Sequence, residues 1–133
     1  MNRELKFRVW DTKLNSLYPF GKGHDEYCFW DKEGNDLTLF DIFRNERYII
    51  QQFTGLKDKN EKEIYEGDII CSPLSKMFLD GDKKGKEIPN VVFYNPGIFM
   101  RRETFDNYCE ELYRNINTYT IVGNIFENPE LLK

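Results

Sequence analysis

Apolar and polar residues alternate along most of the chain, and this alternation predicts a series of short β-strands. Residues 6–11, KFRVWD, alternate and are rich in β-formers, so they predict a first strand. Residues 27–40 predict a hairpin with its turn at Gly34 and Asn35. Residues 47–54 predict a further strand, which Gly55 should end.

The second half of the chain continues this pattern with Gly and Pro between the strands. Residues 68–72 predict a strand that Pro73 should end, because proline cannot donate to a sheet ladder. Residues 91–102 predict two strands around an Asn-Pro-Gly turn, and residues 118–126 predict another strand. The segment 80–86 is expected to be an exposed mobile loop.

Helices are expected in only three places. Residues 41–46 predict a brief helical turn capped by Asp41, and Asn128 with Pro129 predicts the start of a small C-terminal helix. An amphipathic helix is expected from Thr104, because apolar residues then recur at helical spacing: Phe105, Tyr108, Cys109, Leu112 and Ile116. The pattern therefore predicts a mainly β barrel or roll with minor α structure.

The composition fits one small globular domain. The chain has 133 residues, 40% of them hydrophobic and 16% aromatic, which suffices for a core despite 32% charged residues. Its net charge of −4 does not favour nonspecific binding to phosphates. The three cysteines, Cys28, Cys71 and Cys109, are expected to be buried free thiols in a reducing cytoplasm. The sequence shows no run of about 20 apolar residues and no secretory signal, so a cytoplasmic protein without membrane contact is expected.

Catalytic and metal chemistry find little support in the residues. The single histidine, His24, lies in a Gly-rich segment, and no Cys-x-x-Cys spacing occurs. The segment starting at Asp80 resembles a calcium loop, but Lys84 and Val91 occupy positions that need oxygen ligands. No Gly-rich phosphate loop is present. We therefore expect no catalytic residue, no metal site and no cofactor, although the carboxylates of Glu66 and Asp68 leave an enzymatic alternative.

Nucleic-acid binding is the alternative that depends on basic residues. Arg101 and Arg102 lie among aromatic residues and are the candidate nucleic-acid contacts. Successive strand residues point to opposite faces, however, so the two arginines are not expected to share one. The lysines at 83, 84 and 86 are interspersed with acidic residues that nearly neutralise them.

The most patterned stretch is TGLKDKNEKEIYEGDII, residues 54–70, and we interpret it as two turns. Thr54 and Gly55 should end one strand, and Asp58 should satisfy local backbone donors in a polar turn that includes Lys59. A second tight turn is expected at Glu66, Gly67 and Asp68, with Gly67 as its positive-φ residue.

Three segments in this order resemble the YopX family of phage and prophage proteins: KFRVWDTK, QQFTGLKDKNEKEIYEGDII and TIVGNIFENPELL. One departure is Asn60-Glu61, where the family turn usually has Asn-Gly; glutamate disfavours positive φ, so a looser turn is expected. The resemblance implies a mainly β protein with an SH3-type barrel in its C-terminal part. It also implies a phage or prophage origin, the bacterial cytoplasm and oligomers, and it supplies no catalytic residue.

A single family domain is therefore expected over residues 1–133, subdivided into an N-terminal β-hairpin subdomain, 1–48, and an SH3-like barrel, 49–133. The leading hypothesis is a non-enzymatic module that binds a host or phage protein or associates with itself, because exposed aromatics favour interfaces. Trp10, Trp30 and Tyr65 are the candidate partner-binding residues. Nucleic acid is the less favoured partner.

Overall fold

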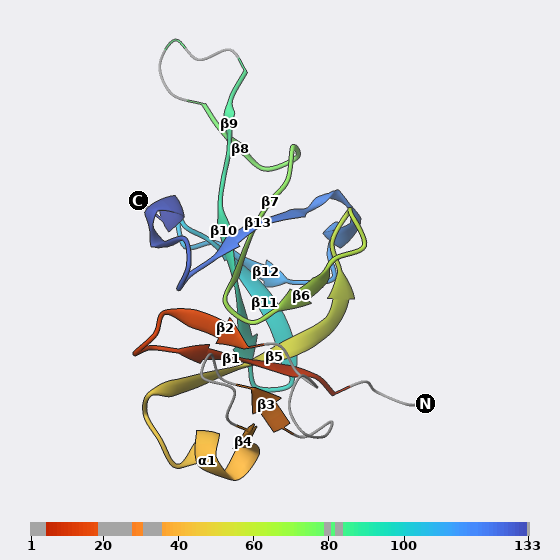
Figure 1. The fold of residues 1–133 in the computed structure, drawn as a ribbon. Helices are drawn as coiled ribbons and strands as arrows, with labels where there is room; N and C mark the ends of the chain where they lie inside the picture. Colours follow the sequence, from red (N-terminus) through yellow and green to blue (C-terminus); the bar gives the residue numbers. More distant parts are fainter. Residues whose placement is uncertain (1–4, 19–27, 31–35, 79–80, 82–83, 133) are drawn as a thin grey trace. The chain divides into compact units, whose positions relative to one another are not determined.

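The chain forms two compact units joined by one long strand. The computed structural model describes residues 5–18, 28–30, 36–78, 81 and 84–132, with backbone alone at 28–30, 36–37 and 39–40. The units are Met1–Phe53 and Thr54–Lys133, called unit 1 and unit 2 below. Strand β5, Tyr48–Lys57, runs from one unit into the other (Figure 1). The sequence-based subdivision was placed between residues 48 and 49, at the start of this strand.

Unit 1 is built around an antiparallel sheet. Strand β1, Phe7–Asp11, lies between β2, Ser16–Tyr18, and the first half of β5. The first strand is thus confirmed, and β2 is a further strand, for which the sequence pattern gave no prediction. The predicted hairpin is also confirmed, as β3, Cys28–Trp30, pairs antiparallel with β4, Asp36–Thr38. The buried core of the unit contains Val9, Tyr18 and Ile42.

The short helix α1, Leu39–Phe43, begins two residues before the predicted turn. The hydroxyl of Thr38 accepts a hydrogen bond from the backbone N–H of Asp41, and the Asp41 carboxylate accepts one from the N–H of Thr38. This reciprocal pair is a capping box, in which the residue before the helix caps it. The predicted cap was therefore wrong, because Thr38 is the N-cap and Asp41 is its partner in the first turn.

Unit 2 contains a five-stranded antiparallel sheet in the order β12-β11-β10-β7-β13. Its strands are β7 Asp68–Cys71, β10 Asn90–Asn95, β11 Ile98–Glu103, β12 Cys109–Glu111 and β13 Thr120–Asn124. The second half of β5 pairs with β6, Glu63–Tyr65. The buried residues of the core come from β6, β7, β10 and β11 and from the positions just after β12 and just before β13: Ile64, Ile70, Val92, Phe99, Leu112 and Tyr119. The protein is mainly β, as predicted, and the SH3-type barrel stays a prediction.

The amphipathic helix predicted from Thr104 is wrong. Residues 109–111 form β12, which pairs with Arg102, Arg101 and Met100 of β11. Of the five apolar residues at helical spacing only Leu112 is buried, and Phe105, Tyr108 and Cys109 are exposed. The pairing with β11 and an ion pair between Arg101 and Glu110 override the local helical period.

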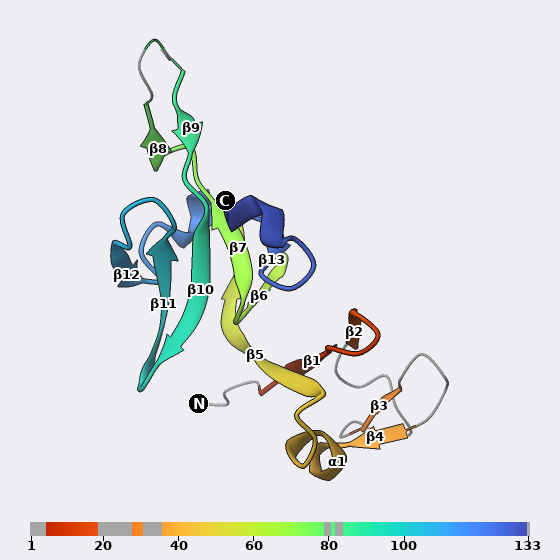
Figure 2. The same cartoon turned by 90° about the vertical axis from the view of Figure 1, so that its left-hand side faces the viewer.

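A two-stranded hairpin extends from the sheet of unit 2. Strand β8, Lys76–Met77, pairs with β9, Lys86–Glu87, and Figure 2 shows both reaching past the ends of β11 and β13. Two short 3₁₀ helices complete the unit, η1 Ile116–Thr118 and η2 Pro129–Leu132. The expected C-terminal helix is therefore present as a single 3₁₀ segment. The side chain of Asn128 accepts a hydrogen bond from the N–H of Asn124 at 3.2 Å.

Candidate partner-binding groove

The family-signature turn is a structural clamp centred on Asp58. This side chain is 4% exposed, and its Oδ1 accepts hydrogen bonds from the N–H groups of Asn60 and Lys62 at 2.8 and 2.9 Å. Its Oδ2 accepts a third from the N–H of Ile121 in β13, at 2.9 Å. Lys59 adds a backbone bond, donating its N–H to the carbonyl of Tyr119 at 2.8 Å. One carboxylate thus shapes the turn and fastens it to the outer edge of β13.

Electrostatics at Asp58 favour the charged carboxylate. Burial raises the pKa of this group, but the hydrogen bonds from the N–H groups of Ile121, Lys62 and Asn60 lower it, and the net pKa lies below its ordinary value. The positive charge of Lys62 acts in the same direction. These partners are all within unit 2, so the charge of Asp58 stabilises the fold of this unit.

Backbone geometry explains the other signature residues. Glu61 takes the left-handed conformation, with φ of 66°, so the departure from Asn-Gly leaves the turn in place with a strained residue. Gly67 has φ of 82° as expected, and the buried Asp68 accepts the N–H of Tyr65 at 2.8 Å. Gly55 has φ of 85°, yet β5 continues beyond it to Lys57, so the prediction that Gly55 ends the strand was wrong.

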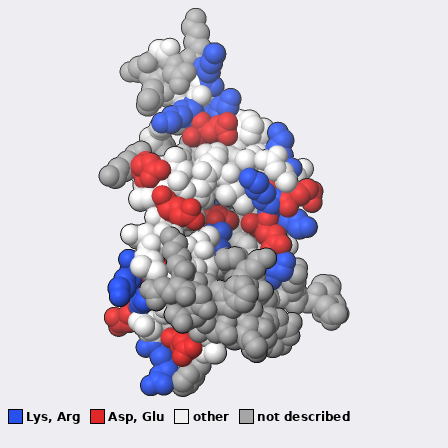
Figure 3. All heavy atoms as spheres, viewed as in Figure 1, with Lys and Arg blue, Asp and Glu red and all other residues white. Residues whose placement is uncertain are grey.

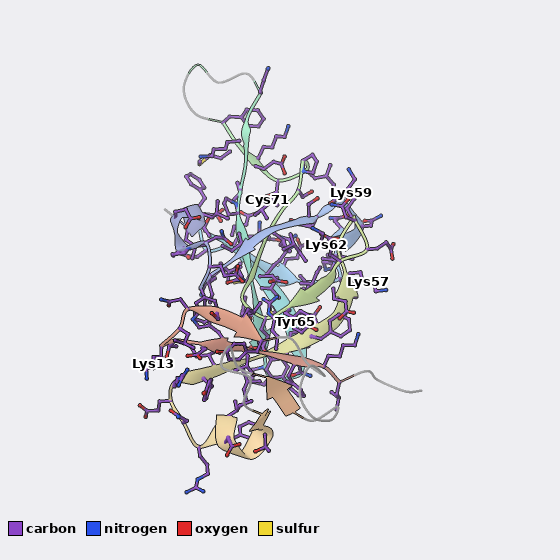
Figure 4. All side chains as sticks on the ribbon, viewed as in Figure 1. Lys13, Lys57, Lys59, Lys62, Tyr65 and Cys71 are labelled. Carbon is purple, nitrogen blue, oxygen red and sulfur yellow. The ribbon has the colours of Figure 1, made fainter. Side chains whose placement is uncertain are left out.

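Thr54 and the lysines of this hairpin lie around the same clamp. The Thr54 hydroxyl donates to the carbonyl of Ile64 at 2.8 Å, which joins β5 to β6. Lys57, Lys59 and Lys62 are exposed and lie along the β5–β6 hairpin (Figure 4). Sequence analysis missed these three lysines as a group, because acidic residues separate them along the chain.

The two candidate nucleic-acid arginines point to opposite faces of β11, as expected from strand geometry. Arg101 is 3% exposed, forms an ion pair with Glu110 and donates to Asn90 Oδ1 at 3.1 Å. Its guanidinium carbon lies 4.7 Å from the centre of the Tyr119 ring. Arg102 is exposed and lies over the ring of Phe93 at 5.7 Å. Only Arg102 is therefore available at the surface for a phosphate contact.

The candidate partner-binding residues are not gathered in one place. Trp10 is buried, with 5% of its surface exposed. Tyr65 is half-buried, and its hydroxyl donates to Glu63 Oε2 at 3.3 Å. The Trp30 side chain lies outside the described residues, as do His24 and the segment from Asp80 that resembled a calcium loop, apart from its residues 81, 84 and 85.

The cysteines differ from the expectation of buried thiols. Cys109 is exposed and Cys71 is half-buried, and both are free. Burial raises the pKa of the Cys71 thiol to about 11, with a further contribution from the charge of Glu87. Cys71 is therefore a protonated thiol at neutral pH, and a nucleophilic role is not favoured there.

A buried ion pair organises unit 1. Arg47 binds the Asp11 carboxylate through Nε at 2.7 Å and Nη2 at 2.6 Å, and the Tyr18 hydroxyl donates to the same carboxylate at 2.6 Å. The Arg47 guanidinium holds the pKa of the Asp11 carboxyl far below its usual range, although burial acts in the opposite direction. The Asp11 oxygens also accept two backbone N–H groups, so this network is a fully engaged structural element of the unit.

The clearest concave surface of unit 2 is an apolar groove of about 340 Å³ beside the β8–β9 hairpin. Below we call it the hairpin groove. Its lining residues come from β8 and β9, the residues after β9, the residues after β11 and helix η2, and among them Phe105 is 65% exposed. The lining residues are Met77, Lys86, Glu87, Ile88, Pro89, Thr104, Phe105, Glu130, Leu131 and Leu132. Such an exposed apolar concavity is typical of binding sites.

A second depression, in unit 1, is larger but shallower. It measures about 560 Å³ and lies beside α1 and the start of β5, with Phe43 and Tyr48 among its lining residues. Phe43 is 73% exposed. Elsewhere in the described parts of the chain, no group of three or more His, Cys, Asp or Glu could hold a metal ion. The described residues also contain no helix long and apolar enough to cross a bilayer.

The comparisons with known proteins agree with this architecture. The YopX protein family matches residues 6–133. The chain belongs to the YopX family. It is similar to protein EF1440 from Enterococcus faecalis, with a TM-score of 0.62, 29% identity and coverage of 99% of this chain and 100% of that one. It also shares its fold with protein yopX from Bacillus subtilis, with a TM-score of 0.58, 18% identity and coverage of 96% and 98%. No curated protein matches the chain.

Proposed function

We propose that this YopX-family chain is a non-enzymatic binding module that recognises a partner protein through the hairpin groove. The observation that carries the proposal is the exposed ring of Phe105 at the wall of an apolar groove of about 340 Å³. A soluble protein that leaves an aromatic ring beside an unfilled apolar concavity gains free energy when another molecule covers both. Residence in a bacterial cytoplasm and an accessory role for a phage or prophage belong to the same proposal.

The test is affinity capture from a bacterial extract with three versions of the tagged protein. Wild type and Phe43→Ala are expected to retain the same stoichiometric protein after nuclease treatment, and Phe105→Ala is expected to lose it. Phe43 is the matched control, because it is an exposed phenylalanine of the other unit. The captured protein is then purified and its affinity for each version measured. Equal affinity for wild type and Phe105→Ala contradicts the proposal, and capture of the chain itself identifies self-association.

Nucleic-acid binding remains the second candidate, supported by the exposed lysines of the β5–β6 hairpin. Lys57, Lys59 and Lys62 all lie on this hairpin (Figure 4), although Glu61 and Glu63 lie between and beside them. This candidate predicts affinity for nucleic acid that falls steeply with salt. The double substitution of Lys59 and Lys62 by Glu should then abolish the binding. Affinity that does not change with salt or with these substitutions contradicts it.

A further inference from the structure

The hairpin groove begins where β11 ends, since Thr104 and Phe105, the two residues after this strand, line it. Strand β11 pairs with β10 as far as Glu103 opposite Asn90, and Thr104 then donates its N–H to the carbonyl of Pro89 at 3.0 Å. Beyond Thr104 the chain turns away towards β12. Strand β9 precedes β10 and continues past this point (Figure 2), and no described strand lies on its β11 side.

In an antiparallel pair of strands, hydrogen-bonded and non-hydrogen-bonded residue pairs alternate, and this alternation shows which backbone groups of β9 point to the β11 side. Ile88 donates its N–H to the carbonyl of Ser75 at 2.9 Å, so the pair Lys76 and Glu87 next to it is the non-bonded kind. In such a pair the backbone groups point outwards. The N–H and C=O of Glu87 therefore face the side on which β11 runs, and among the described residues neither has a hydrogen-bond partner.

The apolar part of the groove lies beside these two groups. Glu87 is itself a lining residue, between Lys86 and Ile88 in the chain, and Leu131 and Leu132 of η2 line the same groove. A volume of about 340 Å³ is near the lower end for ligand pockets, so it suits one large apolar side chain rather than a whole cofactor. Backbone groups that bind a strand, next to a pocket for one of its side chains, are the two requirements of strand addition.

The charges around the hairpin favour an acidic segment. Residues 76–87 carry four lysines against three acidic residues, a net charge of +1 in a chain whose net charge is −4, and Lys76, Lys84 and Lys86 are exposed. Lysine atoms gather on this hairpin and a carboxylate group lies at its base (Figure 3). Opposite charges on neighbouring strands attract, so aspartate or glutamate beside the apolar anchor would complement these lysines.

We propose that the hairpin groove binds an extended, acidic segment of a partner protein, which adds as an antiparallel strand to the outer edge of β9 and places one large apolar side chain in the groove. The segment occupies the line of β11, and its backbone pairs with the N–H and C=O of Glu87. This inference rests on the proposed function, because it states how the partner protein is recognised there.

A displayed library of random nine-residue peptides, selected on the intact wild-type chain, provides the probe. Selected peptides are expected to carry one large apolar residue near Asp or Glu, and their affinity is expected to fall as salt rises. Glu87→Gln removes the carboxylate and keeps the outward N–H, whereas Glu87→Pro removes both, so Glu87→Pro should bind the peptides about tenfold more weakly than Glu87→Gln, the effect of roughly one hydrogen bond with its local geometry. Lys76→Pro and Lys76→Gln are the matched controls: both remove the Lys76 charge, and only Lys76→Pro removes the corresponding outward N–H, which lies on the opposite edge of the ribbon.

Each outcome of this experiment decides something. Equal binding to Lys76→Pro and Lys76→Gln, with weaker binding to Glu87→Pro than to Glu87→Gln, supports strand addition, provided the two proline variants have the same circular dichroism spectrum and thermal midpoint. Glu87→Gln, which keeps the N–H and removes a carboxylate that repels acidic residues, should bind at least as well as wild type. Selection of no binding peptide, or equal binding to Glu87→Pro and Glu87→Gln, overturns the inference. If Phe105→Ala then still loses the captured protein, the groove is used in another way; if it does not, the proposed function itself fails.

Discussion

Two edges of unit 2 contrast in how their backbone groups are satisfied. At the outer edge of β13, the N–H of Ile121 binds the Asp58 carboxylate and the carbonyl of Tyr119 binds the N–H of Lys59. At the outer edge of β9, the N–H and C=O of Glu87 have no such partners among the described residues. Unpaired strand edges attract other chains, and proteins usually cover them. The covered edge therefore serves the fold, and the uncovered edge, which lies beside an apolar groove, suggests a binding site.

The other edge of the five-stranded sheet, β12, follows the covered pattern. The carbonyl of Glu111 accepts the N–H of Arg114 at 3.2 Å, and its carboxylate accepts Arg114 Nε at 2.8 Å. The strand is also only 3 residues long, which leaves little edge for another chain to pair with. The contrast is thus between two blocked edges of the sheet and the open edge of its hairpin.

Removing the clamp should have the largest effect. Asp58→Ala deletes the acceptor of three backbone N–H groups, all bonded to a charged carboxylate, which should lower the free energy of unfolding by about 3 kcal/mol. Urea unfolding followed by circular dichroism measures this loss. Tryptophan fluorescence would report on unit 1 instead, because both tryptophans, Trp10 and Trp30, belong to that unit. The exposed β13 edge should also make the variant associate as concentration rises. A loss within about 0.5 kcal/mol contradicts the clamp.

In the wild-type chain, protonation of Asp58 in acid should weaken its hydrogen bonds to the same edge, that of β13. The folded-state pKa of Asp58 lies below its ordinary value of 3.8, so its charge contributes stability that is fully present above that value. This contribution is lost as pH falls through 3.8 and then through the lower folded-state pKa. The stability of unit 2 should therefore decrease in this acidic range, measured by unfolding at a series of pH values. Asp58→Ala should show a smaller dependence there, and an equal dependence contradicts the assignment.

Removing the backbone strain at Glu61, next to Asp58, should increase the free energy of unfolding by a moderate amount. Glu61 has φ of 66°, a conformation that glycine adopts without strain, so Glu61→Gly should raise the free energy of unfolding by about 0.5 to 1 kcal/mol. Lys59→Gly is the control, since Lys59 is an exposed neighbour outside the left-handed region. It should lower stability, because glycine adds entropy to the unfolded chain without relieving strain. If both variants lose stability, the strain at Glu61 is negligible.

The open edge should contribute least to stability. Glu87→Pro removes a donor that has no described partner, so the free energy of unfolding should change by less than about 0.5 kcal/mol. Chemical denaturation compared with Lys76→Pro checks this. A large loss in Glu87→Pro alone would show that the Glu87 N–H already serves the fold and would remove the contrast between the edges.

Local turn chemistry was accessible from the sequence, and side-chain direction was not. The strand at 68–71, the positive φ of Gly67 and the role of Asp58 as an acceptor for local N–H groups follow from residue types at short spacing. The third partner of Asp58, the N–H of Ile121, is 63 residues away, and no local pattern indicates it. The helical period after Thr104 was misleading, because pairing with β11 decides that segment.

The candidate site could not be predicted for the same reason. The hairpin groove combines Met77, Lys86–Pro89, Thr104–Phe105 and the C-terminal 3₁₀ helix, segments that only the sheet brings together. Aromatic content suggested exposed rings, but Trp10 is buried, and the rings of Phe105 and Phe43 are among the exposed ones. Phe105 lies just after the end of β11, and where that strand ends is a property of strand pairing.

Residue-resolved amide hydrogen exchange, measured by NMR for the free chain and for its complex with a selected peptide, tests the contrast between the edges most directly. The amide of Ile121 should be protected in both states, because it donates to the Asp58 carboxylate. The amide of Glu87 should exchange rapidly in the free chain and become protected in the complex. A Glu87 amide that is already protected in the free chain, or that stays unprotected in the complex, would contradict an open β9 edge that receives a strand.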